Sequence, residues 1–204
     1  MHETPCLSLS GEYIEPYHVR LVAGQRIGRH GFSVTADELA VRRSVLDSLP
    51  LRIVRSGRQF SFEETANTLK WASSEGVRLA VFDPIDWLVP RNQKSQSRYA
   101  DIAAYVLALV DVVKALDLHL VVVFPVNKGG SMAGEEAQRH AAWNILRVER
   151  DDASIGSAAT AKVTVIVEKA RRTPFAGRRL DLLYVRDGAR IAAADDLHGT
   201  GVPF

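Results

Sequence analysis

Apolar and polar positions along the chain follow two periodicities, one typical of buried strands and one typical of amphipathic helices. Continuous apolar runs at residues 79–82 and 120–124 lack the alternation of a half-exposed strand, so we predict two parallel strands buried on both faces. Between them, an apolar stripe over residues 102–116 predicts a long helix. This alternation indicates an α/β fold in which helices cover a mostly parallel sheet.

Two short motifs predict where helices begin. Thr35 with Glu38, and Ser61 with Glu64, have the spacing of a capping box, in which two side chains cap the backbone at the start of a helix. We expect one helix to follow each motif, the second ending at Gly76. Further short strands are predicted at residues 6–10, 51–54, 145–148, 163–167 and 180–185.

Length and composition fit one domain of ordinary size. The chain has 204 residues, of which 47% are apolar, and we expect one domain over residues 1–191 with a loose tail over residues 192–204. Charged residues interrupt the most apolar segment, residues 102–126, so no membrane span is expected. Residues 1–5 lack the pattern of a secretion signal. With Cys6 as the only cysteine, no internal disulfide can form, and a cytoplasmic location is the expectation.

Two acids, Asp83 and Asp86, follow the apolar run at residues 79–82. The carboxyl end of a buried parallel strand is where ligands bind in open α/β sheets, and in nucleotide hydrolases an acid there holds a magnesium ion. The alternative is that Asp83 only begins a turn, which is a common role for Asp after a strand. These positions therefore indicate a candidate ligand site without fixing the ligand.

The order of segments after Asp83 resembles the carboxyl-terminal RecA-like domain of replicative helicases, namely DnaB, the mitochondrial helicase Twinkle and plasmid RepA-type ATPases. A basic loop at residues 91–98, the long helix, the run ending at residues 125–128 and the segment Lys169-Ala-Arg171 occur in the family's order. The resemblance runs over residues 51–191. It implies a three-layer RecA-like domain with a mostly parallel central sheet and a carboxyl-terminal antiparallel hairpin. It also implies a role in DNA replication or processing, with ATP and Mg²⁺ as cofactors.

The resemblance also implies roles for single residues. Asp83 matches the acid that positions magnesium, and Lys169 and Arg171 match a Lys-x-Arg pair that reaches the nucleotide of a neighbouring subunit, so a homo-oligomer or a complex with a helicase-like subunit is implied. An exposed basic hairpin would have the same pattern. The other positions expected to contact the cofactor or to take part in catalysis are Asp86, Asn127, Lys128 and Glu12. Glu12 lies about two residues beyond the family's catalytic position, and a surface glutamate at the start of a helix explains it equally well.

The main departure from the family is an absent motif. The sequence contains no Gly-x-x-x-x-Gly-Lys-Ser/Thr phosphate loop, whose backbone amides and lysine bind the phosphates of ATP. We therefore expect that the chain alone does not hydrolyse ATP. In the family, the strand before this loop lies between the counterparts of residues 120–124 and 145–148, so those two strands are expected to pair directly or to accept a strand from another chain.

Basic residues concentrate near the carboxyl end. Residues 162–190 contain eight basic and three acidic residues, although the whole chain has a net charge of only +2. Together with the loop at residues 91–98, this segment predicts contacts with the phosphates of single-stranded DNA, and a solvated rim is the alternative. The candidate DNA-binding residues are Arg91, Lys94, Arg98, Arg172, Arg178 and Arg179. Trp71, Trp87 and Trp143 fall in or beside expected core elements, which favours packing over base stacking.

Three classes of function remain open on the sequence. The first is a helicase-family ATPase domain whose missing portion is supplied elsewhere. The second is a pseudo-ATPase that binds DNA or a partner subunit without catalysis. The third is an unrelated α/β enzyme with its active site near Asp83.

Overall fold

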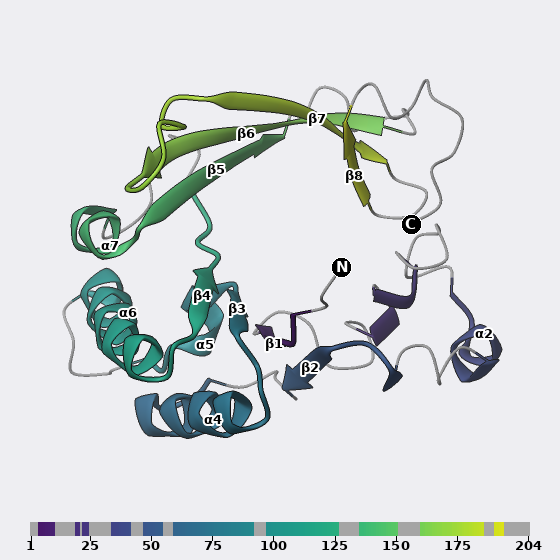
Figure 1. The fold of residues 1–204 in the computed structure, drawn as a ribbon, viewed down its shortest axis with the longest axis horizontal. Coiled ribbons are helices and arrows are strands. Elements are labelled where there is room, and N and C mark those ends of the chain that lie inside the picture. The colour runs from purple at the N-terminus through teal and green to yellow at the C-terminus, as the bar shows by residue number, and fades with distance from the viewer. Residues whose placement is uncertain are drawn as a thin grey trace. The chain divides into compact units, whose positions relative to one another are not determined.

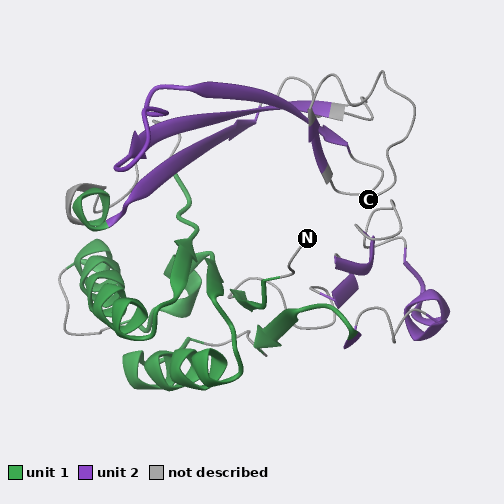
Figure 2. Ribbon diagram, in the orientation of Figure 1, with its two compact units in different colours: residues 1–18, 48–141 green, residues 19–47, 142–204 purple. Residues whose placement is uncertain are grey.

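The computed structural model describes residues 4–10, 19–20, 22–24, 34–41, 47–54, 59–91, 97–126, 135–150, 160–185 and 190–193. Two compact units make up the chain: unit 1 contains residues 1–18 and 48–141, and unit 2 contains residues 19–47 and 142–204 (Figure 2). In chain order the elements are β1 (Cys6–Ser10), α2 (Ala36–Val41), β2 (Leu51–Val54), α4 (Phe62–Ser74), β3 (Leu79–Asp83), α5 (Ile85–Leu88), α6 (Arg98–Ala115), β4 (His119–Val122), α7 (Glu135–Ala141), β5 (Asn144–Arg150), β6 (Thr160–Ala170), β7 (Arg179–Val185) and β8 (Arg190–Ala193) (Figure 1).

Unit 1 is built on a four-stranded parallel sheet with the strand order β2-β1-β3-β4. Each pairing in this sheet is parallel, and β3 lies between β1 and β4. The expected parallel sheet is therefore confirmed, and Asp83 ends an interior strand as predicted. Leu7 and Leu9 on β1 pair with Ala80 and Phe82 on β3, so these four buried residues share one face of the sheet.

The helices α4, α5 and α6 pack on that face and share one apolar core with it. Leu69 on α4 and Leu109 on α6 are completely buried. Both predicted capping boxes are confirmed. At the start of α4, the Ser61 amide donates to the Glu64 carboxylate at 2.9 Å, and the Glu64 amide donates to the Ser61 hydroxyl at 3.1 Å. Thr35 makes the same reciprocal contacts with Glu38 before α2. The stripes of apolar residues thus fold as helices because the local caps and the shared core favour the same conformation.

Strand β4 differs from its predicted burial. The continuous apolar run at residues 120–124 predicted a strand buried on both faces, but Val121 is 46% and Val123 is 38% exposed. The prediction was wrong because β4 is at the edge of the sheet and pairs only with β3 in the described part of the chain. Leu120 and Val122 do contact the core under α6. An edge strand therefore carries a sequence typical of an interior strand.

Unit 2 contains a four-stranded antiparallel sheet with the order β5-β6-β7-β8. The antiparallel part is thus larger than the single hairpin that the sequence predicted. Strand β5 pairs with β6 and lies in a different sheet from β4, so direct pairing of these two strands is absent from the described residues. Strand β8 extends to Ala193 and includes the first two residues of the segment expected to be a tail, and residues 194–204 lie outside the described residues.

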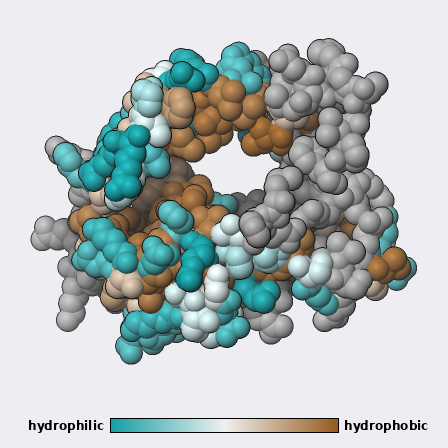
Figure 3. Space-filling model, in the orientation of Figure 1, coloured by the Kyte–Doolittle hydropathy of each residue, from teal (hydrophilic) through white to brown (hydrophobic). Residues whose placement is uncertain are grey.

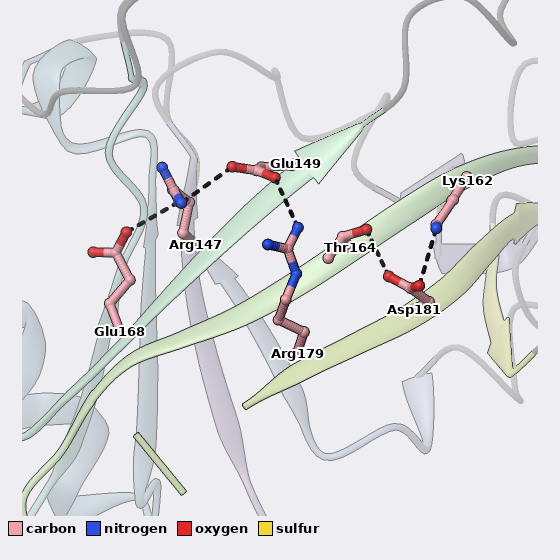
Figure 4. Close-up of polar contacts among 7 residues, drawn as sticks. All are labelled: Arg147, Glu149, Lys162, Thr164, Glu168, Arg179 and Asp181. Carbon is pink, nitrogen blue, oxygen red and sulfur yellow. Dashed lines mark hydrogen bonds and ion pairs between the residues drawn. The ribbon is translucent and has the colours of Figure 1, made fainter. Parts of the chain in front are cut away.

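The two faces of the unit 2 sheet have different chemistry. On one face, Arg147 lies 3.3 Å from Glu149 and 3.0 Å from Glu168, and Lys162 lies 2.9 Å from Asp181 (Figure 4). The strand register places apolar residues on the other face, and Figure 3 shows apolar residues gathered along this sheet. Its most exposed members are Leu146, Val148, Leu180 and Ile191, each at least 55% exposed.

Within the described ranges, no helix is long and apolar enough to cross a membrane.

Candidate functional site

The carboxyl edge of the parallel sheet in unit 1 positions Asp83. It is the last residue of β3 and pairs with Ser10, the last residue of β1. The backbone on the other side is fixed as well, because the Val123 amide donates to the Phe82 carbonyl at 2.9 Å and the Ile85 amide donates to the Val123 carbonyl at 3.0 Å. The Asp83–Pro84 peptide bond is cis, and α5 begins at the next residue. The sheet therefore holds the Asp83 backbone from both neighbouring strands.

The segment after Asp83 is held by Arg98. The Arg98 guanidinium donates hydrogen bonds to the carbonyl oxygens of Asp86, Val89 at 2.7 Å and Pro90 at 2.9 Å. Burial lowers the pKa of Arg98, and the neighbouring charge of Arg91 lowers it further. These contacts give Arg98 a role in shaping the turn, while its contact with DNA stays a prediction.

Asp86 on α5 provides a second carboxylate near this edge. Its Oδ1 atom is buried and has no hydrogen-bond partner among the described residues. An orphaned acceptor of this kind is costly in a folded protein unless a donor or a cation satisfies it. A magnesium ion held by Asp83, Asp86 and the phosphates of a nucleotide therefore stays a prediction, with the buried Asp86 oxygen as the one observation in its favour.

A nucleotide site also needs groups that bind the phosphates, and the sequence contains no phosphate-loop motif to supply them. Whether ATP binds at this edge therefore stays a prediction from the sequence. Glu12, Lys94, Asn127 and Lys128, which were predicted to contact nucleotide or DNA, lie outside the described residues. In the parts of the chain that are described, no group of three or more His, Cys, Asp or Glu residues is arranged to hold a metal ion.

A second site lies in unit 2, at the end of the sheet where β6 connects to β7. Lys169 is on β6 and pairs with Ile145, and the Arg171 amide donates to the Trp143 carbonyl at 3.1 Å. The structure thus brings the predicted Lys169 and Arg171 to one end of the antiparallel sheet, together with Arg172 and Arg178. Asp83 belongs to the other unit.

Sequence reasoning missed two aromatic residues at this end. The Arg172 guanidinium carbon lies 4.3 Å from the centroid of the Trp143 ring, and that of Arg178 lies 4.7 Å from the centroid of Phe175. Trp143 is 48% exposed, so the expectation that it packs in the core was wrong. Phe175 is 45% exposed. The string Arg171-Arg-Thr-Pro-Phe-Ala-Gly-Arg-Arg179 carried a signal, because Pro and Gly among basic residues are typical of an exposed turn.

The other two tryptophans also differ from the core packing that was expected. Trp71 on α4 is 48% exposed and Trp87 on α5 is 59% exposed. Of the predicted DNA-binding residues in unit 2, Arg179 lies 3.8 Å from Glu149 (Figure 4). Arg172 and Arg178 have no acidic partner among the described residues. The three arginines are therefore not equally available to a ligand.

These features define an α/β fold with a four-stranded parallel sheet, in which an acidic residue ends an interior strand, and a four-stranded antiparallel sheet. The domain is similar to a DnaB-like replicative helicase whose structure was solved to describe its interactions with primase, with a TM-score of 0.74 and 15% identity over 93% of this chain and 50% of that one. It is also similar to a second solved structure, that of an isolated ATPase domain, with a TM-score of 0.76 and 14% identity over 93% of this chain and 74% of that one. No protein-family model matches the sequence, and no curated protein matches it.

At these identities the likeness shows the fold, which is that of a DnaB-like RecA domain, and the expected fold class is confirmed. The chain spans half the length of the helicase and about three quarters of the isolated ATPase domain. What those proteins bind or hydrolyse does not follow from the fold alone.

Proposed function

We propose that this chain is a DnaB-like RecA domain of the helicase family that acts in DNA replication or processing and cannot hydrolyse ATP alone. The observation that carries the proposal is the position of Asp83 at the carboxyl end of β3, paired with Ser10, in a chain without a phosphate loop. With Asp86 beside it, Asp83 would hold the magnesium ion of a nucleotide whose phosphates are bound by a segment from elsewhere.

Lys169 and Arg171 would act toward the nucleotide of a neighbouring subunit. Support comes from their position at the end of the unit 2 sheet, next to the connection between β6 and β7. A cation delivered in this way stabilises the charge that develops during phosphoryl transfer. The proposal therefore includes a homo-oligomer or a complex with a helicase-like subunit.

A steady-state hydrolysis assay tests the proposal. The 204-residue chain with ATP and Mg²⁺ is expected to give no turnover above the uncatalysed background. Turnover that is lost in Asp83→Ala and kept in Asp111→Ala would contradict it, since Asp111 is an exposed acid on α6 far along the chain from the edge.

A second candidate function is a regulator that binds a partner subunit without catalysis. The observation that favours it is the open edge of β4, where an interior-type apolar sequence exposes Val121 and Val123. Exposed strand edges of this kind readily pair with another chain. A strand supplied by a partner would extend the parallel sheet by pairing with the backbone of β4.

A further inference from the structure

The end of the unit 2 sheet carries two aromatic rings that are both exposed and both stacked with arginine. Trp143 directly precedes β5, and Phe175 lies in the connection between β6 and β7. The pairing of Asn144 with Ala170 and the 3.1 Å hydrogen bond from the Arg171 amide to the Trp143 carbonyl bring the two segments together. We call Trp143, Arg172, Phe175 and Arg178 the aromatic–arginine cluster.

The backbone holds the Phe175 side of this cluster in place. The Gly177 amide donates to the Val167 carbonyl at 2.7 Å, and the Arg178 amide donates to the Phe175 carbonyl at 3.0 Å. Gly177 has a φ of 85°, a left-handed conformation that glycine adopts without strain. Phe175 and Arg178 are therefore fixed by a hydrogen-bonded turn.

The turn that carries most of the cluster is strongly basic. Residues 169–179 contain five basic residues and no acid. Arg179 is partly neutralised by Glu149, whereas Arg172 and Arg178 have no acidic partner in the described part of the chain. A phosphate or carboxylate ligand therefore meets two arginines whose positions are set by the rings that they cover.

The exposure of the two aromatic rings favours one class of anionic ligand over the others. About half of each aromatic side chain is exposed, although burying an aromatic ring is one of the larger favourable terms in folding. A purely acidic protein segment would use the charge and leave the exposed parts of both rings uncovered. A duplex keeps its bases stacked inside, whereas a single strand offers unstacked bases to aromatic rings and phosphates to arginines.

We infer that the aromatic–arginine cluster binds single-stranded nucleic acid, with bases stacked on Trp143 and Phe175 and phosphates bound by Arg172 and Arg178. The inference deepens the proposed function, on which it rests for its biological setting, by naming the residues that hold the strand. The proposed function directs the neighbouring Lys169 and Arg171 at a nucleotide, so different residues at the same end of the sheet would bind the two ligands.

Anisotropy of a labelled oligothymidine, titrated with the full chain at several salt concentrations, tests the inference. Trp143→Ala and Phe175→Ala are each expected to weaken binding by about 5-fold to about 150-fold, as for the loss of one stacked base. Trp143→Phe, which keeps a ring, should restore most of the affinity. Trp71→Ala is the matched control, because Trp71 is also 48% exposed but lies on α4 in unit 1, and it should bind as the unmodified chain does.

The arginines are tested by the salt dependence. Arg172→Ala and Arg178→Ala should each reduce the slope of log affinity against log salt by about 0.7, the value for one phosphate contact on a single strand. Arg172→Lys should keep the slope and lose affinity, because lysine keeps the charge and loses the planar stack. Melting temperatures of all variants confirm that they are folded.

Three results would overturn the inference. Unchanged binding by Trp143→Ala and Phe175→Ala, with binding still present, would place the strand elsewhere and leave the proposed function intact. If oligothymidine does not bind at low ionic strength, both the inferred site and the proposed role in DNA replication or processing are contradicted. Equal displacement of the oligonucleotide by polyglutamate and by unlabelled oligothymidine at matched charge would indicate a site for acidic protein.

Discussion

Ser10 and Asp83 lie opposite each other at the carboxyl ends of the parallel strands β1 and β3. Ser10 is only 2% exposed, so the edge places a buried hydroxyl group beside the acid that ends the interior strand. Paired residues of neighbouring strands project from the same face of a sheet. Sheet hydrogen bonds fix the backbone of unit 1 at this edge, which makes its stability testable.

The Tyr105 hydroxyl is expected to stabilise the junction between α4 and α6. It is hydrogen-bonded to the Thr65 hydroxyl and donates to the Phe60 carbonyl at 3.3 Å, and both Thr65 and Tyr105 are buried. Tyr105→Phe should lower the free energy of unfolding by about 1 to 3 kcal/mol, because it leaves a buried partner unsatisfied. Urea denaturation measures the change. Tyr99→Phe, on the same helix and 54% exposed, should be nearly neutral, and an equal loss in both variants would refute the assignment.

Arg98 is expected to hold the turn that follows Asp83. Its charged donors bond the carbonyls of Asp86, Val89 and Pro90, so Arg98→Met should lower the free energy of unfolding by about 2 to 4 kcal/mol. Arg78→Met is the control, since the Arg78 guanidinium bonds the adjacent Val77 carbonyl, at 3.5 Å, and no other partner within the described ranges. Chemical denaturation of both variants gives the comparison, and a loss in Arg98→Met no larger than in the control would contradict the role of Arg98.

The ion pair between β6 and β7 predicts an acid-dependent loss of stability. Hydrogen bonds from Lys162 and then Thr164 hold the pKa of Asp181 below its ordinary value of 3.8. A carboxyl group whose pKa is lowered by folding adds stability at any pH above its pKa in the unfolded chain. That stability is lost as the pH falls from about 3.8 through the lower pKa of the folded chain. Thermal unfolding followed across this window should therefore show a steeper decline in the unmodified chain than in Asp181→Asn. Because the carboxylate is exposed, the difference is expected to be small. Identical pH profiles would refute the contribution of Asp181.

The open edge of β4 predicts which amides exchange with solvent. The His119 amide donates to the Arg78 carbonyl and the Val123 amide to the Phe82 carbonyl, both at 2.9 Å, so these two amides point toward β3. The alternating amides of Leu120 and Val122 then point toward the open edge. In a monomer, residue-resolved hydrogen exchange should be fast at Leu120 and Val122 and slow at His119 and Val123.

Mass in solution, measured alongside, gives the control for that experiment. Protection of Leu120 and Val122 in a larger assembly is expected if another chain adds a strand to β4. Protection of the same amides in a species with the mass of one chain would contradict an open edge, because the strand would then be paired within the chain itself.

The features that could be predicted from the sequence are those set by local chemistry. The capping boxes at Thr35 and Ser61 and the run ending at Asp83 depend on neighbours within a few residues, and the structure confirms them. The burial of β4 depends on which strands flank it, and its apolar run carries no information on that order. Trp143 was misjudged for the same reason, since its stacking partner Arg172 is 29 residues away and is brought near only by the sheet.

Isothermal titration of ATP and Mg²⁺ into the 204-residue chain tests the central claim most directly. A RecA-fold domain that lacks the amide cradle and the lysine of a phosphate loop is expected to bind ATP no more tightly than about 1 mM, which leaves no resolvable binding heat in an ordinary titration. Asp83→Ala should then behave like the unmodified chain. A micromolar affinity for ATP that Asp83→Ala abolishes would contradict the account, because it would mean that this chain contains a complete nucleotide site.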